Sequence, residues 1–251
     1  MHDERIVAEF SHQAETFNRS AVARATETLD DLARLAAPDP SERWLEVACG
    51  PGLVSRALAP HVREVLGVDI TPAMVEVARR EAAAAGQSNV TFAVGGATAL
   101  ELPDASFDGA VARFTIHHVP VPGRLVEELA RVVRPGGGVV LADHIADDDA
   151  DAAAWSQEVE RLRDPSHWAS LPLERLRELG EQAGLRLEEE HVVPIELDFE
   201  DWLQRGSGGA AAPVIERALA MRPGGTDCFQ LGGQKGRRVL GLKMWLARWR
   251  H

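Results

Sequence analysis

Short apolar runs alternate with stretches of helical periodicity through the first part of the chain. The apolar runs, which predict strands, lie at residues 44–49, 64–69, 90–94, 107–114 and 139–143. Apolar positions spaced by three or four predict helices after residue 52, over 71–86 and over 123–133. Because the strands are almost uniformly apolar and alternate with helices, we expect a parallel sheet that is covered on both faces.

The two ends of the chain follow other patterns. Phe10, Phe17 and Val22 belong to a series of apolar positions that predicts one helix over residues 5–36. The pattern changes after residue 145, where helices are expected over 172–183 and near 213–221 and strands over 185–197 and 239–246. The stretch 204–237 around the second helix is rich in glycine. The prediction is an α/β protein with a Rossmann-like, mostly parallel seven-stranded sheet and a helical cap inserted after the fifth strand.

A glycine-rich turn joins the first predicted strand to its helix, with Ala48, Gly50 and Gly52 at alternate positions. Such a turn lets the backbone approach a nucleotide-like ligand at a helix N-terminus. Asp69 ends the following strand, where its carboxylate can accept from both hydroxyls of a ribose. The GxGxxG spacing of dinucleotide-binding folds is absent. Glu46 would repel a phosphate but can face a cationic methionine, so these residues favour S-adenosylmethionine (SAM) over NAD.

Four segments, taken in order, resemble the successive motifs of class I SAM-dependent methyltransferases, in the branch of UbiE-like and related small-molecule enzymes. They are Trp44 to Gly52, Val68-Asp69-Ile70-Thr71-Pro72-Ala73-Met74, Ala97 to Asp108, and Arg131-Val132-Val133-Arg134-Pro135-Gly136-Gly137. The lead segment Phe10 to Phe17 resembles the N-terminal helix that closes over SAM in that branch. The resemblance implies one methyltransferase domain over 1–251, divided into lid helices (1–40), a SAM-binding core (41–144), a cap and substrate segment (145–172) and C-terminal strands and helices (173–251).

The resemblance also implies roles for the matching positions. Asp69 would hold the ribose hydroxyls, and Glu46 and Arg113 would lie at the methionine end. The other implied cofactor residues are Ala48, Cys49 and Gly50 beneath the methionine and ribose, Ile70, Met74, Ala97 and Thr98 around the adenine, and Phe17 on the lid. Gly96 departs from the family pattern, which has an acid at this position for the adenine amino group. Adenine recognition would then rely on backbone and water, or SAM would bind more weakly.

Three histidines and a carboxylate follow the fourth and fifth predicted strands. In open α/β sheets the ligand lies at the carboxyl ends of the strands. Histidine has an unperturbed pKa that suits proton removal near neutrality. We therefore expect His117 or His118 as a general base, with His144 as the next candidate and Asp143 as a partner. The alternative is that these residues only position the acceptor, since methyl transfer depends largely on alignment.

The segment after the fifth strand holds candidates whose role the sequence leaves open. Asp147-Asp148-Asp149 resembles a carboxylate metal site, but we expect these residues to cap the next helix and expect no metal. Trp155, Trp168 and Trp202 either line an acceptor pocket or pack the cap onto its domain. His167, in the turn after Asp164, faces either the pocket or solvent.

Charge and composition narrow the partners. The net charge of −12 disfavours nucleic acid, because Lys235-Gly236-Arg237-Arg238 and the C-terminal arginines are only short basic runs. The charged N-terminus and the lack of a long apolar run predict neither a signal peptide nor a membrane span. Cys49 lies inside the cofactor turn, so a disulfide there is not expected and a reducing cytoplasm is. The chain is expected as a monomer or homodimer.

The leading hypothesis is a SAM-dependent methyltransferase that acts on an oxygen, nitrogen or carbon atom of a small, apolar or aromatic acceptor. Two alternatives keep the SAM site. One is a natural-product enzyme of non-methylating, cyclase-like chemistry, and the other is a SAM-binding partner subunit without catalysis. The sequence does not separate the first alternative from methyl transfer, because both reactions need the same cofactor loops.

Overall fold

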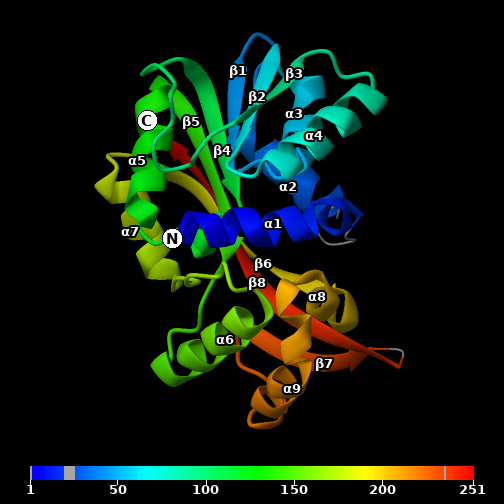
Figure 1. Cartoon of the computed structure of the whole chain (residues 1–251). Helices are drawn as coiled ribbons and strands as arrows, with labels where there is room; N and C mark the ends of the chain where they lie inside the picture. The colour runs from blue at the N-terminus through cyan, green and yellow to red at the C-terminus, as the bar shows by residue number, and fades with distance from the viewer. Residues whose placement is uncertain (1, 20–25, 235) are drawn as a thin grey trace.

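The computed structural model describes residues 2–19, 26–234 and 236–251, arranged around one central sheet (Figure 1). The strands are β1 (Arg43–Val47), β2 (Glu64–Asp69), β3 (Val90–Val94), β4 (Phe107–Arg113), β5 (Val133–His144), β6 (Arg186–Asp198), β7 (Phe229–Gln234) and β8 (Arg237–Arg250). Their order across the sheet is β3-β2-β1-β4-β5-β8-β6, and β7 pairs with β8.

The first five strands are mutually parallel, whereas β8 runs antiparallel to β5, β6 and β7. The predicted path of seven mostly parallel strands is therefore confirmed. The eighth strand, β7, lies in the glycine-rich stretch 204–237, where no strand was predicted. Its sequence contains Gly232 and Gly233, which weaken any strand pattern, and it pairs because the 14-residue β8 extends far beyond β5.

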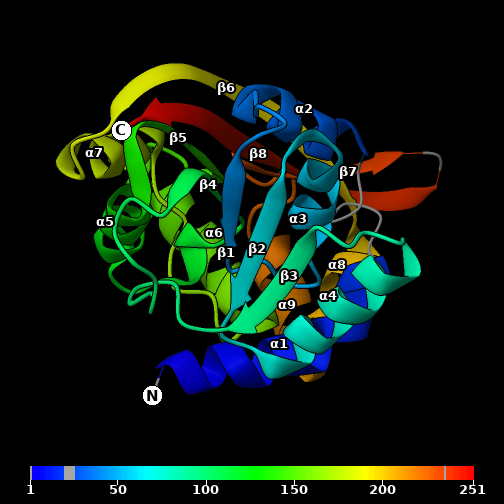
Figure 2. The same cartoon turned by 90° about the horizontal axis from the view of Figure 1, so that it is seen from above.

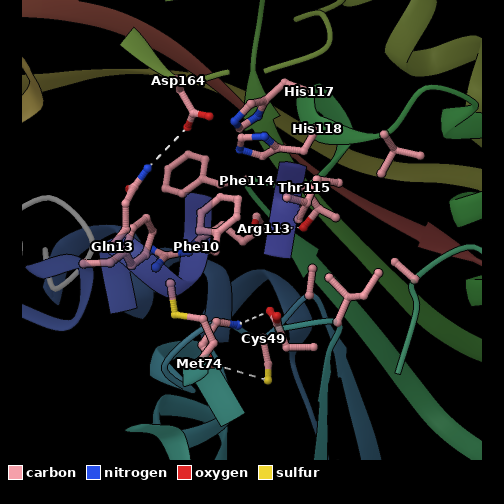
Figure 3. Close-up of a pocket in the computed structure, with 18 of the residues that line it drawn as sticks. Phe10, Gln13, Cys49, Met74, Arg113, Phe114, Thr115, His117, His118 and Asp164 are labelled. Carbon is pink, nitrogen blue, oxygen red and sulfur yellow. Dashed lines mark hydrogen bonds between the residues drawn. The ribbon is translucent and has the colours of Figure 1, made fainter. Parts of the chain in front are cut away.

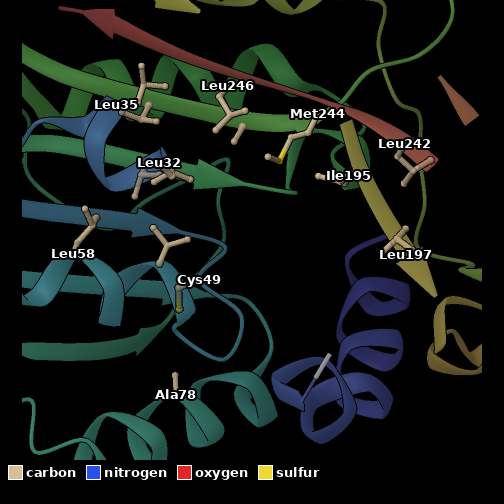
Figure 4. Close-up of a cluster of buried hydrophobic side chains, with 14 of the residues drawn as sticks. Leu32, Leu35, Cys49, Leu58, Ala78, Ile195, Leu197, Leu242, Met244 and Leu246 are labelled. Atoms are coloured by element: carbon tan, nitrogen blue, oxygen red, sulfur yellow. The ribbon is translucent and has the colours of Figure 1, made fainter. Parts of the chain in front are cut away.

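Helices cover both faces of the sheet (Figure 2). They are α2 (Thr26–Ala36), α3 (Leu53–Leu58) and α4 (Pro72–Ala84) on one face, and α5 (Pro122–Val132) and α7 (Leu173–Gln182) on the other. Successive residues of β5 show the two sides: Val140 packs with the cluster that contains Leu32 and Leu58, and Leu141 packs with the cluster that contains Leu125. Figure 4 shows the first cluster, where Leu32, Leu58 and Leu246 approach from helix and sheet. The apolar strands are thus buried on both faces.

Two helices occupy the region where one was expected. α1 (His2–Arg19) packs Phe10 and Phe17 against α4, whereas α2 packs Leu32 and Leu35 on the sheet. The prediction of one continuous helix is wrong because the two apolar faces serve different partners. Val22 belonged to that predicted helix and lies outside the described residues. α1 crosses the middle of the molecule between the sheet core and the cap, where a lid helix was expected (Figure 1).

The cap is built from two segments far apart in the sequence. α6 (Ala150–Arg163) comes from the segment predicted as the cap. The structure adds α8 (Phe199–Arg205), the short helix η3 (Ser207–Ala211), α9 (Ala212–Ala220) and β7, which pack beside α6 (Figure 1). Gly206 permits this approach, because a Cβ there would lie 2.3 Å from the Arg163 carbonyl oxygen. The glycine-rich stretch 204–237, where only the helix near 213–221 was predicted, therefore completes the cap.

Candidate active site

A cavity of about 450 Å³ lies at the carboxyl ends of β1, β2 and β4, beneath α1 and beside the cap. We call its two sides the core wall and the cap wall. The core wall comes from residues 46–53, 69–74, 95–98 and 113–118, and the cap wall consists of Glu160, Arg163, Asp164, Leu197, Trp202, Arg205 and Leu242. Figure 3 shows Phe10 and Gln13 of α1 and Phe114 of the core wall around this space. The cavity lies where parallel α/β sheets bind their ligands.

The turn after β1 is shaped by left-handed backbone at alternate residues. Ala48, Gly50 and Gly52 have φ of 52°, 50° and 73°. The three alternate positions in the sequence are thus the three residues with left-handed backbone. At Gly52 no side chain fits, since a Cβ would lie 2.6 Å from the Phe92 ring. The turn exposes its backbone along the floor of the cavity.

Asp69 holds this turn against the next one. Its carboxylate accepts from the backbone N–H of Gly50 at 2.8 Å and from that of Thr71 at 2.8 Å. Burial raises the pKa of Asp69, and the two N–H donors oppose that rise. The same carboxylate lines the cavity, so it connects two loops and also faces a ligand.

Glu46 and Arg113 bring opposite charges to the core wall. Glu46 accepts from the backbone N–H of Ser55 at 2.6 Å and also from the Ser55 hydroxyl. Burial raises the pKa of Glu46 to about 7, although the hydrogen bonds from Ser55 and the charge of Arg113 act in the opposite direction. Burial lowers the pKa of Arg113 to about 10, and the nearby Glu46 counteracts this shift. At neutral pH the arginine is charged while Glu46 is poised between its two forms.

The remaining residues predicted to bind cofactor also line the cavity. They are Phe17, Ala48, Cys49, Gly50, Ile70, Met74, Ala97 and Thr98. Gly96 lies among them, and a Cβ there would meet no described atom within 4 Å. Burial raises the pKa of Cys49 well above its usual value, so the thiol is neutral and small rather than reactive.

Asp143 fixes the turn that follows β4. Its Oδ2 accepts from the backbone N–H groups of Thr115 at 3.0 Å and Ile116 at 2.6 Å. Its Oδ1 lies 2.5 Å from the His117 Nδ1. These bonds hold Phe114 at a φ of 55°, a conformation that costs a non-glycine residue about 1–3 kcal/mol. The carboxylate therefore places both an aromatic ring and a histidine on the core wall.

His117 and Asp143 form a buried imidazole–carboxylate pair. Burial alone would lower the pKa of His117, but the charge and hydrogen bond of Asp143 raise it above 6.5. The pair also fixes the tautomer, because a proton on Nδ1 bonded to the carboxylate leaves Nε2 as the acceptor. His117 lines the cavity, and this arrangement makes it the stronger base among the candidates.

The other two predicted histidines are neutral. Burial and the nearby charge of His117 lower the pKa of His118 to about 3, and its Nδ1 lies 3.2 Å from the Ser166 carbonyl oxygen. Burial also lowers the pKa of His144 to about 3, and its ring stacks on that of His117 at 5.0 Å. Both line the cavity, so all four predicted catalytic residues lie together.

The chain also resembles known methyltransferases. A family model described as a methyltransferase domain matches residues 45–141. The methyltransferase YcgJ of Bacillus subtilis (strain 168), itself uncharacterized, is 32% identical over 197 residues, which are 78% of each chain. Its solved structure superposes with a TM-score of 0.78 at 29% identity, covering 90% of this chain and 98% of that chain.

Two further relatives agree with this result. The structure of BH2331 from Bacillus halodurans C-125 gives a TM-score of 0.81 at 28% identity, over 89% of this chain and 98% of that chain. A demethylmenaquinone methyltransferase from Clavibacter sepedonicus is 38% identical over 110 residues, 44% of each chain, which supports the UbiE-like branch in part. This chain belongs to the class I SAM-dependent methyltransferases. SAM is the cofactor that the family implies, as expected from the glycine turn and Asp69.

The cap wall of the methyltransferase holds one candidate whose role the sequence left open, Trp202, and one residue that it missed, Arg205. Trp202 is buried and lines the cavity, so one of the three candidate tryptophans belongs to the pocket. Trp155 packs edge-to-face on Phe229 within the cap, and Trp168 is about half exposed. Arg205, at the last residue of α8, was missed because no local motif marks a residue that tertiary packing alone brings to the cavity.

α1 joins the two walls of the methyltransferase. Gln13 donates to Glu9 at 2.6 Å and to Asp164 of the cap wall at 3.5 Å. Glu9 accepts in turn from the backbone N–H of Ser207 at 2.8 Å. His167 is buried against Gln157 at 2.5 Å rather than facing the cavity or solvent. The lid is therefore bonded to the cap as well as packed on the core.

The acidic and basic runs of the methyltransferase are largely structural. Of the three aspartates expected to cap the next helix, Asp149 caps α6 by accepting from the Ala152 N–H at 2.7 Å, whereas Asp147 accepts from the Thr226 hydroxyl at 2.6 Å and the Cys228 N–H at 3.1 Å. The expectation of no metal stays a prediction, since ligand atoms of His117, Asp143 and His144 lie within 4.8 Å of one another. Arg238 pairs with two glutamates, and Arg248 and Arg250 pair with Glu188. Among the described residues, no helix combines the length and the apolarity that crossing a membrane requires.

Proposed function

We propose that this methyltransferase moves the methyl group of SAM to an oxygen, nitrogen or carbon atom of a small-molecule acceptor with an apolar or aromatic body. One observation carries the proposal. The groups suited to SAM on the core wall and the base His117, held by Asp143, line one and the same cavity. A cofactor bound on the core wall would therefore face a space with room for the methyl acceptor, and His117 in that space would accept the proton.

The core wall suits SAM group by group. Asp69 uses its carboxylate on two backbone N–H donors and keeps further acceptor positions for ribose hydroxyls. Glu46 and Arg113 offer opposite charges to the ammonium and carboxylate of the methionine part. The other parts of SAM would contact the remaining predicted residues. Ala48, Cys49 and Gly50 would lie beneath the ribose, and Ile70, Met74, Ala97, Thr98 and Phe17 would surround the adenine. Backbone and water take the place of the missing acid at Gly96.

Bound SAM would supply a methyl group on a positively charged sulfur: the acceptor atom would bond to the methyl carbon in line as the carbon–sulfur bond breaks, leaving S-adenosylhomocysteine. The chain's contribution is to align the acceptor and to exclude water, which lowers the barrier by removing translational and rotational freedom in advance. α1, which bonds to the cap through Gln13 and Glu9, closes the cavity on the side away from the sheet.

His117 would accept a proton from the acceptor at Nε2, because Asp143 holds its other nitrogen. His118 and His144, both neutral at pH 7, would position the acceptor instead. Its body would pack on the apolar side chains that line the rest of the space, which include Phe10, Phe114 and Trp202.

The test is to incubate the purified protein with SAM and a panel of aromatic and apolar acceptors that carry hydroxyl, amino or activated carbon positions. We expect S-adenosylhomocysteine together with an acceptor that has gained one methyl group, both measured by mass spectrometry. An acceptor converted to an isomer of equal mass without S-adenosylhomocysteine would instead support the cyclase-like alternative. The His61→Ala variant, exposed and remote from the cavity, serves as the matched control for His117→Ala.

A further inference from the structure

Arg205 differs from the other arginines of the cap. It is the last residue of α8, its side chain is only 8% exposed, and it lines the cavity. It makes no hydrogen bond to any other described residue, and its buried Nε lacks a partner. A buried guanidinium without hydrogen bonds destabilises a fold, and its remaining contacts, the Asp201 carboxylate at 3.7 Å and the Phe17 ring at 5.6 Å, offset that cost only in part. Such a group indicates a ligand.

The carboxylates around Arg205 do not take the place of such a ligand. Asp201 is the nearest, with Oδ2 3.7 Å from the Arg205 Nε, beyond hydrogen-bond reach, and its side chain is 47% exposed. Glu160 and Asp164 lie closer to Arg163, at 3.5 and 3.8 Å. Asp164 also accepts from the backbone N–H and the hydroxyl of the neighbouring serine. The acids of the cap wall are therefore engaged elsewhere.

We infer that Arg205 binds an anionic group of the acceptor, a carboxylate or a phosphate, so that the acceptor is an apolar or aromatic acid. The planar guanidinium offers N–H donors in the fork geometry that matches these two groups. Trp202, Leu197 and Leu242 of the same wall supply the apolar surface beside it. The inference rests on the proposed function, because it assigns a ligand group to the part of the cavity that bound SAM would leave free.

Arg205 comes from the cap side of the cavity, and its guanidinium lies 5.6 Å from the Phe17 ring of α1. α8 lies on the cap side of α1, whereas β1 and β2 with their loops lie on the other side (Figure 1). Arg113, adjacent to Glu46 on the core wall, is the arginine placed for the methionine carboxylate. Burial and the charge of Arg163 lower the pKa of Arg205 to about 10, which leaves it charged at neutral pH.

The experiment uses the full chain saturated with S-adenosylhomocysteine, so that the methionine carboxylate site is already filled. Inorganic phosphate, benzoate and the neutral benzamide are titrated at constant ionic strength, by calorimetry and by the melting temperature. The variants are Arg205→Met, Arg205→Lys and, as the control, Arg217→Met, which removes an exposed arginine of α9 in the same cap.

We expect phosphate or benzoate to bind the wild type and Arg217→Met saturably, and benzamide not to bind. Binding should weaken by about tenfold or more in Arg205→Met, as for a lost charge-assisted hydrogen bond, and S-adenosylhomocysteine should bind as before. Preference for one anion identifies the group as phosphate or carboxylate. If Arg205→Met does not fold, Arg205→Lys is expected to weaken anion binding severalfold.

Three results would overturn the inference. They are the absence of saturable anion binding to the wild-type complex, equal binding by the Arg205 variants, and a loss of S-adenosylhomocysteine affinity in Arg205→Met. The last result would place Arg205 on the cofactor instead of the acceptor. Binding of S-adenosylhomocysteine to the wild type is measured first, before any anion is added. If the wild type does not bind it, the proposed function itself is overturned.

Discussion

The core wall and the cap wall of the cavity are built by different means. On the core wall, four segments that follow neighbouring parallel strands present backbone and short side chains, and Asp69 and Asp143 each hold a turn through backbone N–H groups. On the cap wall, long side chains come from α6, β6, α8 and β8, and the charges of Arg163, Glu160 and Asp164 act on that of Arg205. The core wall is fixed by backbone geometry, and the cap wall by side-chain packing.

The difference explains how one fold can serve one cofactor and many acceptors. Backbone turns pinned at strand ends change little when surface residues change, so the cofactor end is constrained. The cap contacts α1 through a few polar interactions, such as Glu9 with Ser207, Gln13 with Asp164 and Arg205 over the Phe17 ring. Its lining can vary without disturbing the sheet, and specificity is therefore expected there.

The largest effect on catalysis is expected for substitution of His117, where the core wall meets the cap. The backbone oxygen of His117 accepts from Trp168 of the cap at 2.8 Å. His117→Ala should lower kcat by about 100- to 10,000-fold, as for loss of a general base, while S-adenosylhomocysteine binds normally. Because Asp143 raises the pKa of His117 above 6.5, kcat/KM of the wild type should rise with pH through that region and level off. An unchanged profile in the variant would show that His117 only positions the acceptor.

A substitution at Gly206 tests whether the cap wall depends on close packing. In Gly206→Ala the new Cβ would lie 2.3 Å from the Arg163 carbonyl oxygen, so the loop must move away from α6. We expect the free energy of unfolding, measured in urea, to fall by about 1–3 kcal/mol. Gly224→Ala, whose Cβ would meet no described atom within 4 Å, is the matched control in the same cap. S-adenosylhomocysteine affinity should stay within twofold if the core wall stands independently.

Glu46 offers a test confined to the core wall. Its pKa of about 7 means that the cofactor-free protein is largely protonated there at pH 6. The methionine ammonium favours the charged carboxylate, so cofactor binding should release a proton. We therefore expect S-adenosylhomocysteine to bind about tenfold more weakly at pH 6 than at pH 8, one unit of pKa being a factor of ten. Calorimetry in buffers of different ionisation enthalpy measures the proton, and Glu46→Gln should remove both effects.

The smallest expected effect concerns the contact between lid and cap. Gln13→Ala removes a hydrogen bond within α1, to Glu9, and the hydrogen bond from α1 to Asp164 of the cap wall. A net loss of about 1 kcal/mol of stability is expected, since each such bond replaces one made with water. Cofactor dissociation, followed by stopped-flow, should become faster. The exposed neighbour His12→Ala is the control, and a larger loss there would show that α1 itself, rather than this bond, holds the lid.

Much of the core wall could be predicted from the sequence because its determinants are local. The alternate positions of Ala48, Gly50 and Gly52 correspond to three left-handed residues. Asp69 was predicted because it ends the next strand, and its carboxylate does bond to this turn. All eleven residues predicted to bind cofactor line the cavity. The pairing of His117 with Asp143 was expected in outline, yet the choice among the three histidines needed their surroundings. Burial and neighbouring charge, which sequence does not give, separate their pKa values.

The sequence by itself determined the parallel sheet, the cofactor turn and the family, since strand periodicity, turn glycines and strand-end acids are short-range properties. Only the tertiary structure separated α1 from α2, recruited the segment from α8 to β7 into the cap, and brought Arg205 to the cavity without a hydrogen-bond partner among the described residues. These features depend on contacts between residues far apart in the chain. Their burial and charge balance exist only once the two walls have packed around the same space.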